Sequence, residues 1–198
     1  MIIALAVVAV LALWAVLTYN RLVQLRLACE SSWSQIDVAL RLRHDLVPRL
    51  AEAVAGYAGH ERATFENVAA ARSRAVEANT AAPAARGPVE AVLGAAIGPA
   101  LLLAEDYPEL LATESFTQLQ SELSAVEEKI SITRRVYNDT VETYNTLIQV
   151  FPPVLIARAF GFTRREFFDA PAEAEVAPEV RYSAVAQAEG GGPAPEAK

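Results

Sequence analysis

Cysteine, histidine and basic residues are all scarce in this sequence. One cysteine excludes an intrachain disulfide, and with only two histidines a four-ligand structural zinc site would need carboxylates. Acidic residues outnumber basic ones by 24 to 17, so the formal net charge is -7 and no basic surface for a phosphate backbone is evident. The composition therefore argues against disulfide chemistry, structural zinc and nucleic-acid binding.

Charge is also missing from the N-terminus, where no charged side chain precedes Arg21. Residues 2–19 form one apolar run, and about 18 helical residues just span a hydrocarbon core of about 30 Å. Trp14 and Tyr19 then lie at a membrane interface, where amphipathic aromatic rings concentrate. We predict a transmembrane anchor over residues 1–20, with the lipid bilayer as a first partner of the chain.

A cleaved signal peptide is the alternative interpretation of this run. The run has no basic n-region, and its Ala4-Leu5-Ala6 motif comes too early for a cleavage site, so the pattern favours an anchor. Arg21 and Arg26 follow the run with no acid between them, and the positive-inside rule places them in the cytoplasm. We therefore expect a single-pass protein of the cell (inner) membrane, with its N-terminus outside and its helical body cytoplasmic.

Helical periodicity continues beyond the anchor. Apolar residues recur at steps of three, four and seven, which places them on one face of a helix. This spacing predicts helices over residues 21–55, 61–78, 89–105 and 115–150. The first continues directly from the membrane span, with a kink at Pro48, and ends near Gly56 and Gly59.

Prolines and glycines mark the predicted interruptions of this pattern. Residues 79–88 contain two prolines and a glycine, and we predict a loop there. Gly94 and the Gly98-Pro99 pair weaken the third helix, for which we expect a kink or two short pieces. Ser115 and Gln118 have the spacing of a capping box at the start of the fourth helix.

The lengths of these helices define the architecture. The first and fourth are each about 50 Å long, whereas the second and third are about half as long. Short connections then give an up-down bundle, with four helices in its distal half and two in its membrane-proximal half. The fold class is all-α: an N-terminal transmembrane helix continuing into an elongated antiparallel helical bundle over residues 21–168. The apolar seam left uncovered in the proximal half favours a homo-oligomer.

The C-terminal region has a different composition. The fourth helix ends at Phe151-Pro152-Pro153, because proline disfavours helix in the residue before it. From Ala170 the chain is rich in Ala, Pro, Glu and Gly, with five glutamates against Arg181 and Lys198. We predict a disordered tail over residues 169–198, since such a composition buries little apolar surface.

Aromatic residues and arginines gather after the fourth helix. The phenylalanines are Phe151, Phe160, Phe162, Phe167 and Phe168, and the arginines are Arg158, Arg164 and Arg165. The returning fourth helix brings them to the bilayer surface, where both residue types suit an interface. They are therefore candidate membrane-surface residues. The alternative is that these phenylalanines close the end of the bundle core, and both interpretations stay open.

Two tyrosines of the fourth helix lie seven residues apart and share a face. Tyr137 and Tyr144 can bury their rings in a helix seam and present their hydroxyls at its edge. Trp33 lies on the seam of the first helix. Packing explains these residues most simply, and the three are also the candidate seam for interaction with a protein partner.

The sequence offers no constellation of catalytic or ligand-binding residues. His44 and His60 lie roughly 18 Å apart along a helix, too far to share a metal ion. Cys29 occupies a seam position where a buried, inert thiol packs well. The glycine cluster at 190–192 has the context of a tail and not of a phosphate loop. We therefore predict no catalytic, cofactor or metal site, and no small-molecule substrate is evident.

Short motifs in a fixed order nevertheless resemble the LemA family. The motifs are Tyr19-Asn20-x-Leu22-Val23, Ser32-Trp33-Ser34-Gln35-Ile36-Asp37-Val38, Arg43-His44-Asp45-Leu46-Val47-Pro48, Gly56-Tyr57-Ala58-Gly59-His60-Glu61, Tyr107-Pro108-Glu109-Leu110, Phe116-x-x-Leu119-Gln120-x-Glu122-Leu123, Tyr137-Asn138 with Tyr144-Asn145, Phe151-Pro152 and Phe160-Gly161-Phe162. They cover the chain from about residue 19 to residue 182, and the sequence departs from the family pattern at Gly98-Pro99.

The resemblance implies a bacterial membrane protein with one N-terminal span and a helical cytoplasmic body. It implies no enzyme activity and no catalytic residues. Members of the family occur beside genes for membrane metallopeptidases or TPM-domain proteins, and one branch belongs to magnetosome membranes. These associations point only to the kinds of partner that the chain could have.

The residues and the resemblance together favour a membrane-anchored helical scaffold or adaptor for protein–protein interaction, with an unidentified protein partner. The rival hypothesis is an accessory or regulatory subunit of a membrane protease or another membrane complex, recruited through the C-terminal tail. An enzyme in its own right is the least favoured of the three.

Overall fold

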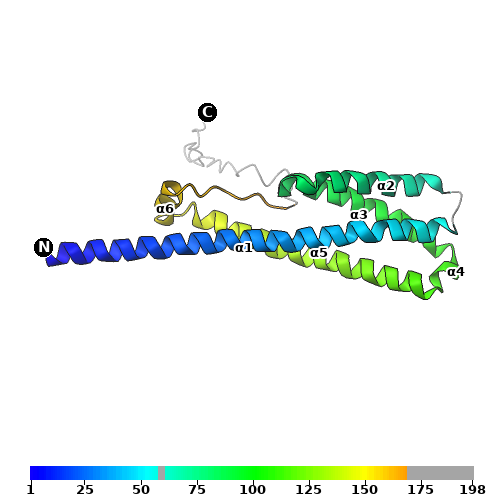
Figure 1. The fold of residues 1–198 in the computed structure, drawn as a ribbon, viewed down its shortest axis with the longest axis horizontal. Helices are drawn as coiled ribbons and strands as arrows, with labels where there is room; N and C mark the ends of the chain where they lie inside the picture. The colour runs from blue at the N-terminus through cyan, green and yellow to red at the C-terminus, as the bar shows by residue number, and fades with distance from the viewer. Residues whose placement is uncertain (58–60, 169–198) are drawn as a thin grey trace, which may run out of the picture.

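The structure, a computed structural model, describes residues 1–57 and 61–168. Within these ranges it is all-helical and elongated, and Figure 1 shows its long helices lying nearly parallel to one axis. The predicted tail at 169–198, and the predicted helix end at Gly59, lie outside the described residues. The all-α bundle that periodicity predicts is confirmed.

Helix α1 (Ile2–Ala55) is one continuous helix of 54 residues, about 81 Å long. It joins the predicted anchor to the predicted first bundle helix without a connecting loop, as expected. Buried residues begin at Thr18 and recur at helical spacing to Val54, whereas every earlier residue is at least partly exposed. The helix is followed by Gly56, whose amide donates to the Glu52 carbonyl.

Pro48 lies inside α1, and the helix continues past it. Proline has no amide hydrogen, so the carbonyl of His44, four residues earlier, loses its usual helical partner. Arg72 replaces that partner, because its Nε donates to the His44 carbonyl at 2.7 Å. Arg72 belongs to α2 (Arg62–Glu77), so the proline creates a tie between two helices.

The predicted loop at 79–88 is wrong over most of its length. A 3-10 turn (Ala78–Thr80) follows α2, and α3 (Pro83–Glu105) already begins at its first proline. Pro83 occupies the first turn, where no amide hydrogen is needed. Arg86, in the next turn, is almost fully buried and bonds to Asn79, and this packing holds the segment in helix.

Of the two alternatives for the third helix, two short pieces is wrong, since α3 runs through Gly98-Pro99 as one helix, and a kink there stays a prediction. Pro99 leaves the carbonyl of Ala95 without its helical hydrogen-bond donor. Both residues are exposed, so water can bond this carbonyl instead. On the opposite side of α3, Ile97 and Ala100 are buried in the core. Tertiary packing therefore outweighs the local cost of the proline.

Two short helices and one long helix follow α3 in the part of the chain that the structure describes. These are α4 (Pro108–Leu111), α5 (Glu114–Leu147) and α6 (Pro153–Ala159). The capping box predicted at Ser115 is wrong by two residues: Thr113 is the N-cap, and its Oγ1 accepts from the amide of Phe116. Thr113 takes this role because its backbone is still extended while that of Ser115 is already helical.

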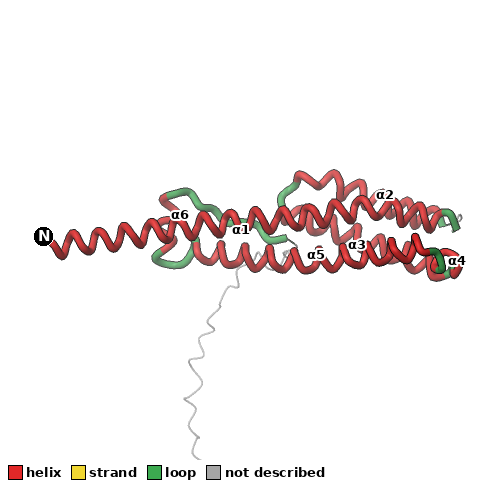
Figure 2. Tube along the Cα trace, turned by 60° about the horizontal axis from the view of Figure 1, so that its bottom comes forward, coloured by secondary structure: helices red, strands yellow, loops and turns green. Residues whose placement is uncertain are grey.

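The helices form the predicted up-down arrangement. Helix α5 lies antiparallel to α1 along most of its length, and the α2–α3 pair covers the distal half of this long pair (Figure 1). The view in Figure 2 shows the same pairing from another side. In the proximal half, residues 160–168, here called the strap, run beside α1 and α5. The strap covers part of the seam that was expected to stay open, and self-association stays a prediction.

Candidate functional site

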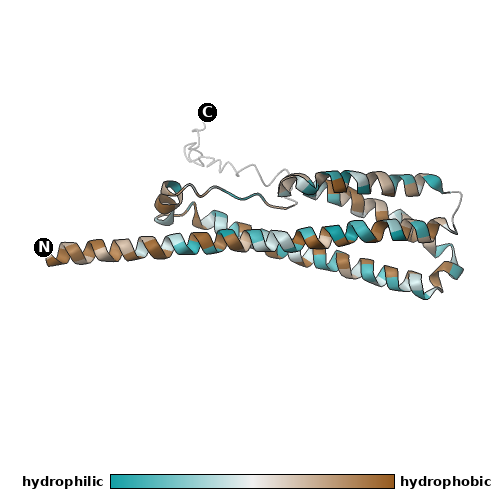
Figure 3. Ribbon diagram, in the orientation of Figure 1, coloured by the Kyte–Doolittle hydropathy of each residue, from teal (hydrophilic) through white to brown (hydrophobic). Residues whose placement is uncertain are grey.

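The N-terminal end of α1 is apolar and without internal packing. Its most apolar 18-residue window has a mean hydropathy of 2.6, and none of that window is buried. Figure 3 shows this end as a continuous apolar stretch projecting beyond the other helices. Helix α3 also has the length and composition of a span, with a mean hydropathy of 1.6, but one third of its window is buried within the bundle.

The predicted interface residues lie where α1 enters the bundle. Trp14 is half-buried, and the Tyr19 ring lies 4.8 Å from the ring of Phe160 and 5.8 Å from that of Phe162, measured between centroids. Arg21 is exposed. Arg26 is exposed as well and pairs with Glu30 at 3.4 Å.

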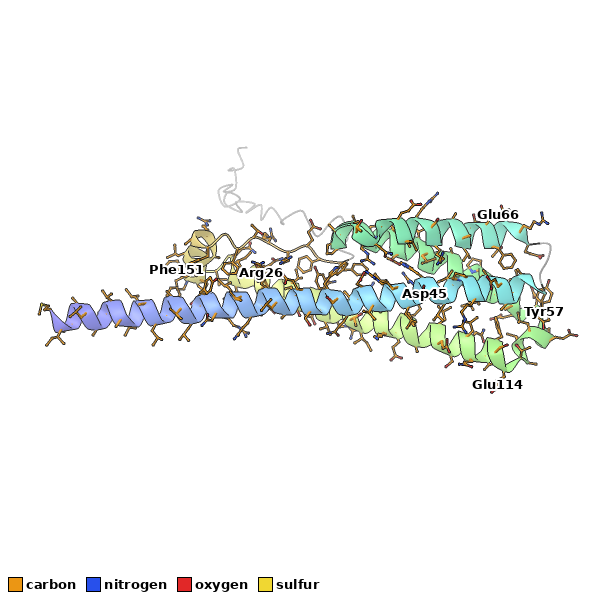
Figure 4. The ribbon with its side chains drawn as sticks, viewed as in Figure 1. Arg26, Asp45, Tyr57, Glu66, Glu114 and Phe151 are labelled. Carbon is orange, nitrogen blue, oxygen red and sulfur yellow. The ribbon has the colours of Figure 1, made fainter. Side chains whose placement is uncertain are left out.

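The five candidate membrane-surface phenylalanines separate into two groups. Phe151 and Phe160 are 79% and 63% exposed, and Phe151 lies in the proximal half of the molecule, as Arg26 does (Figure 4). Phe162 is half-buried against Tyr19. The interface prediction therefore stands as a prediction for Phe151 and Phe160 only.

Phe167 and Phe168 lie elsewhere, and for them the interface prediction is wrong. Phe168 is buried, with its ring 5.7 Å from that of Trp33, and Phe167 packs against the same core. Trp33 is about 21 Å further along α1 than Tyr19. Because the strap is extended and follows the bundle away from α6, its last residues close the core instead of facing a membrane.

Side chains of α5 fix the strap in one register. Asn145 and Asn138 each make two hydrogen bonds to the backbone of one strap residue. The Asn145 amide group accepts from and donates to Arg165, both at 2.8 Å, and Asn138 binds Phe168 in the same way at 2.9 Å. Each asparagine thus satisfies both backbone groups of an extended residue, as a neighbouring β-strand would.

The three residues of the predicted interaction seam are directed into the molecule. Tyr144 and Tyr137 are buried, and their hydroxyls donate to the strap carbonyls of Thr163 and Glu166 at 3.0 and 2.8 Å. Burial raises the pKa of Tyr137 to about 12. The Trp33 ring lies 5.3 Å from that of Tyr137. The strap therefore occupies the side of this seam that was expected to meet a partner.

Cys29 lies on the same internal seam. Its side chain is buried, and this burial raises the pKa of the thiol. A thiol in such surroundings is mostly protonated at neutral pH and is a poor nucleophile.

Two buried polar clusters connect the helices of the distal half. In the first, Arg86 of α3 pairs with Asp37 of α1 at 2.7 Å and donates to the Asn79 side chain at 3.1 Å. Its guanidinium also lies 5.3 Å from the ring centroid of Trp33, within cation–π range. This cluster joins the beginning of α3 to α1 at the level where the strap ends.

The second cluster centres on Glu90 of α3, which is 3% exposed. Its carboxylate accepts hydrogen bonds from Arg43 and from Nε2 of His44, the latter at 3.0 Å. Arg43 also donates to Glu127 of α5 at 3.1 Å. Burial alone raises the pKa of Glu90, but the hydrogen bonds from His44 and Arg43 outweigh burial and hold it below its usual range.

Sequence reasoning missed both clusters. His44 is buried, and its near neighbour Arg41 pairs with Asp37 at 2.9 Å. A signal was present, because Arg43 continues the three- and four-residue steps of Ile36, Leu40 and Val47. A charged residue at a core position of a helix indicates a buried partner on another helix.

A groove lies between α3 and α5, and α1 residues line only its smaller part. Its larger part has a volume of about 950 Å³ and is lined by α3 residues such as Gly98 and by α5 residues such as Ser124. A smaller part of about 250 Å³ reaches Arg43 and Phe168. Gly94 and Glu127 line both parts, so the groove is continuous. Among residues 1–57 and 61–168 no three His, Cys, Asp or Glu side chains are placed to hold a metal ion.

The exposed apolar end of α1 continues into a helical bundle that buried ion pairs hold together. This fold is typical of membrane-associated, all-helical proteins. Comparison with known sequences places the chain more narrowly. The LemA family profile matches residues 32–182. Since this match covers about three quarters of the chain, the chain belongs to the LemA family, as the motifs predicted.

Three curated relatives are similar at low identity. Magnetosome proteins MamQ 1 and MamQ 2 of Paramagnetospirillum magneticum are each 26% identical over 194 residues, covering 83% of this chain and 71% of the relative. Magnetosome protein MamQ of Magnetospirillum gryphiswaldense is 24% identical over 174 residues, covering 76% of this chain and 64% of the relative.

Proposed function

We propose that the chain is a membrane-anchored scaffold or adaptor that holds a helical bundle at a fixed height above the bilayer. The supporting observation is the burial pattern of α1, in which no residue before Thr18 is buried and internal packing begins there. An apolar segment of this length with no internal partner suits a bilayer core. In this proposal, residues 2–19 span the inner membrane and the body is cytoplasmic.

The connection between span and bundle gives the scaffold its stiffness. Because α1 is one helix, the bundle cannot rotate freely against its anchor as it would on a flexible linker. The part of α1 beyond Arg21 is about 52 Å long and carries the distal end away from the membrane.

The proximal end of the bundle provides a second contact with lipid. Phe151, Leu155 and Phe160 are 79%, 57% and 63% exposed, and Phe160 contacts Tyr19 at the end of the proposed span. Arg158 and Arg164 in the same region are exposed. Exposed aromatic and aliphatic side chains with neighbouring arginines suit an interface with acidic headgroups.

The adaptor role is tested by extracting the protein from native membranes in polymer nanodiscs. Mass photometry then gives the stoichiometry, and mass spectrometry identifies proteins that copurify. We expect a stoichiometric non-enzymatic membrane partner or a defined homo-oligomer. A protease bound in fixed ratio would instead favour the accessory-subunit hypothesis, and a monomer without partners would contradict both.

A flexible insertion separates scaffolding from simple anchoring. Ten Gly-Ser residues inserted after Asn20 preserve the span and the bundle but uncouple them, and an insertion of equal length after Ala112, between α4 and α5, is the control. We expect loss of the copurifying partner only with the first insertion. Partner binding that tolerates it would show that a fixed height is not required.

A further inference from the structure

The register between α5 and the strap follows a simple repeat. Asn145 and Asn138, the two asparagines that bind the strap, are seven residues apart, and the strap residues they bind, Arg165 and Phe168, are three residues apart. Seven helical residues rise about 10.5 Å, and three extended residues advance about 10 Å. One heptad of α5 therefore accommodates three residues of extended chain.

The same face of α5 continues beyond the strap with hydrogen-bonding side chains. Further seven-residue steps reach Ser131, Ser124 and Thr117. Ser131 lines the smaller part of the α3–α5 groove, and Ser124 and Thr117 line the larger part. Phe168 lines the smaller part too, so the described chain ends at the entrance of the groove.

The groove has room for another extended segment. Its α3 wall contains Gly94 and Gly98, and a Cβ added at Gly98 would meet nothing within 4 Å. In the smaller part, Nε of the buried Arg43 has no hydrogen-bond partner. A backbone carbonyl lying in the groove could accept from such a donor or from the serine hydroxyls.

We propose that residues 169–182 bind in this groove as a continuation of the strap. The repeat places Pro171, Ala174 and Ala177 opposite Ser131, Ser124 and Thr117. The segment is rich in alanine and proline, whose side chains suit a wall built with glycine. The LemA profile also continues to residue 182, so the family module includes this segment. This internal docking is independent of the scaffold function proposed above.

Cysteine pairs test the register in the full-length protein in nanodiscs. S124C with A174C should form a disulfide under mild oxidation about tenfold faster than A125C with A174C, because only the first pair is held in register. Ala125 is the matched control, being adjacent on α5 and exposed. Equal rates for the two pairs would overturn the proposal.

A second variant fills the groove without disturbing the core. G98W places an indole at an open position of the groove wall, and A95W adds the same side chain at an exposed position that does not line it. In the S124C/A174C background, G98W should reduce crosslinking to the control rate with an unchanged melting temperature, and A95W should not. Full crosslinking in G98W would show that residues 169–182 lie outside the groove.

Discussion

Individual residues of the distal half show how polar groups stabilise a helical core. Glu90 receives hydrogen bonds from both Arg43 and His44, so one carboxylate of α3 orients two side chains of α1. The burial of Cys29 was predictable from its seam position. The burial of Glu90 was not predictable, because its apolar neighbours on α3 do not indicate which residues of α1 lie opposite it.

Loss of the Glu90 charge should destabilise the bundle. Glu90→Gln leaves His44 without a carboxylate and Arg43 with only that of Glu127, and breaking a buried pair in this way costs about 3 kcal/mol. Thermal unfolding followed by circular dichroism in nanodiscs measures this loss. The control is Glu128→Gln, an exposed residue of α5. Equal melting temperatures for the two variants would show that the cluster contributes nothing.

The same carboxylate predicts a dependence of stability on pH. The pKa of Glu90 in the folded protein lies below its ordinary value of 4.5. Its contribution is therefore complete above about pH 4.5 and is lost as the pH falls through the lower folded pKa. The difference in unfolding free energy between wild type and Glu90→Gln should shrink on acidification. A difference that grows below pH 4.5 would contradict the direction of this shift.

At the scale of elements, the sequence predicted the long helices α1 and α5 and failed at the connections. Long helices repeat their pattern over many turns, so periodicity identifies them. The start of α3 depends instead on the contacts of Arg86 with Asp37 and Asn79, which come from elsewhere in the chain. The strap was missed because its partners, Asn138 and Asn145, hold backbone groups and require no side-chain pattern.

The tie between α1 and α2 gives a double-mutant test. Arg72→Met leaves the His44 carbonyl without its donor, a loss of about 1 to 3 kcal/mol. Pro48→Ala restores an amide hydrogen that can bond the same carbonyl, so Arg72→Met should cost much less in the Pro48→Ala background. Chemical denaturation of the four proteins gives the coupling. Additive costs would mean that Arg72 acts in another way.

Removal of one asparagine should release the end of the strap. Asn138→Ala deletes both hydrogen bonds to Phe168, and hydrogen exchange of the strap amides from 166 to 168 should accelerate at least about fivefold. Asp139→Ala, at the exposed neighbouring position, is the control. Unchanged exchange would indicate that packing of Phe168 alone holds the strap.

At the scale of the whole molecule, a single helix carries both the exposed apolar segment and part of the bundle core. Composition was enough to predict this division, because the first charged side chain is Arg21. In the structure the first buried residue is Thr18, close to that boundary. Composition could not divide the phenylalanines between exposed positions and the core. That division depends on the direction of the strap, which takes Phe168 away from the span and leaves Phe160 beside it.

Lipid quenching at Phe160 tests the central claim that the bundle rests on a bilayer through its proximal end. Phe160→Trp in a Trp14→Phe background is reconstituted with brominated lipids, and Trp33, in the bundle, serves as the internal reference. Phe167→Trp in the same background is the matched control. We predict strong quenching for Trp at 160 and little at 167. Equal and weak quenching at both positions would contradict the account.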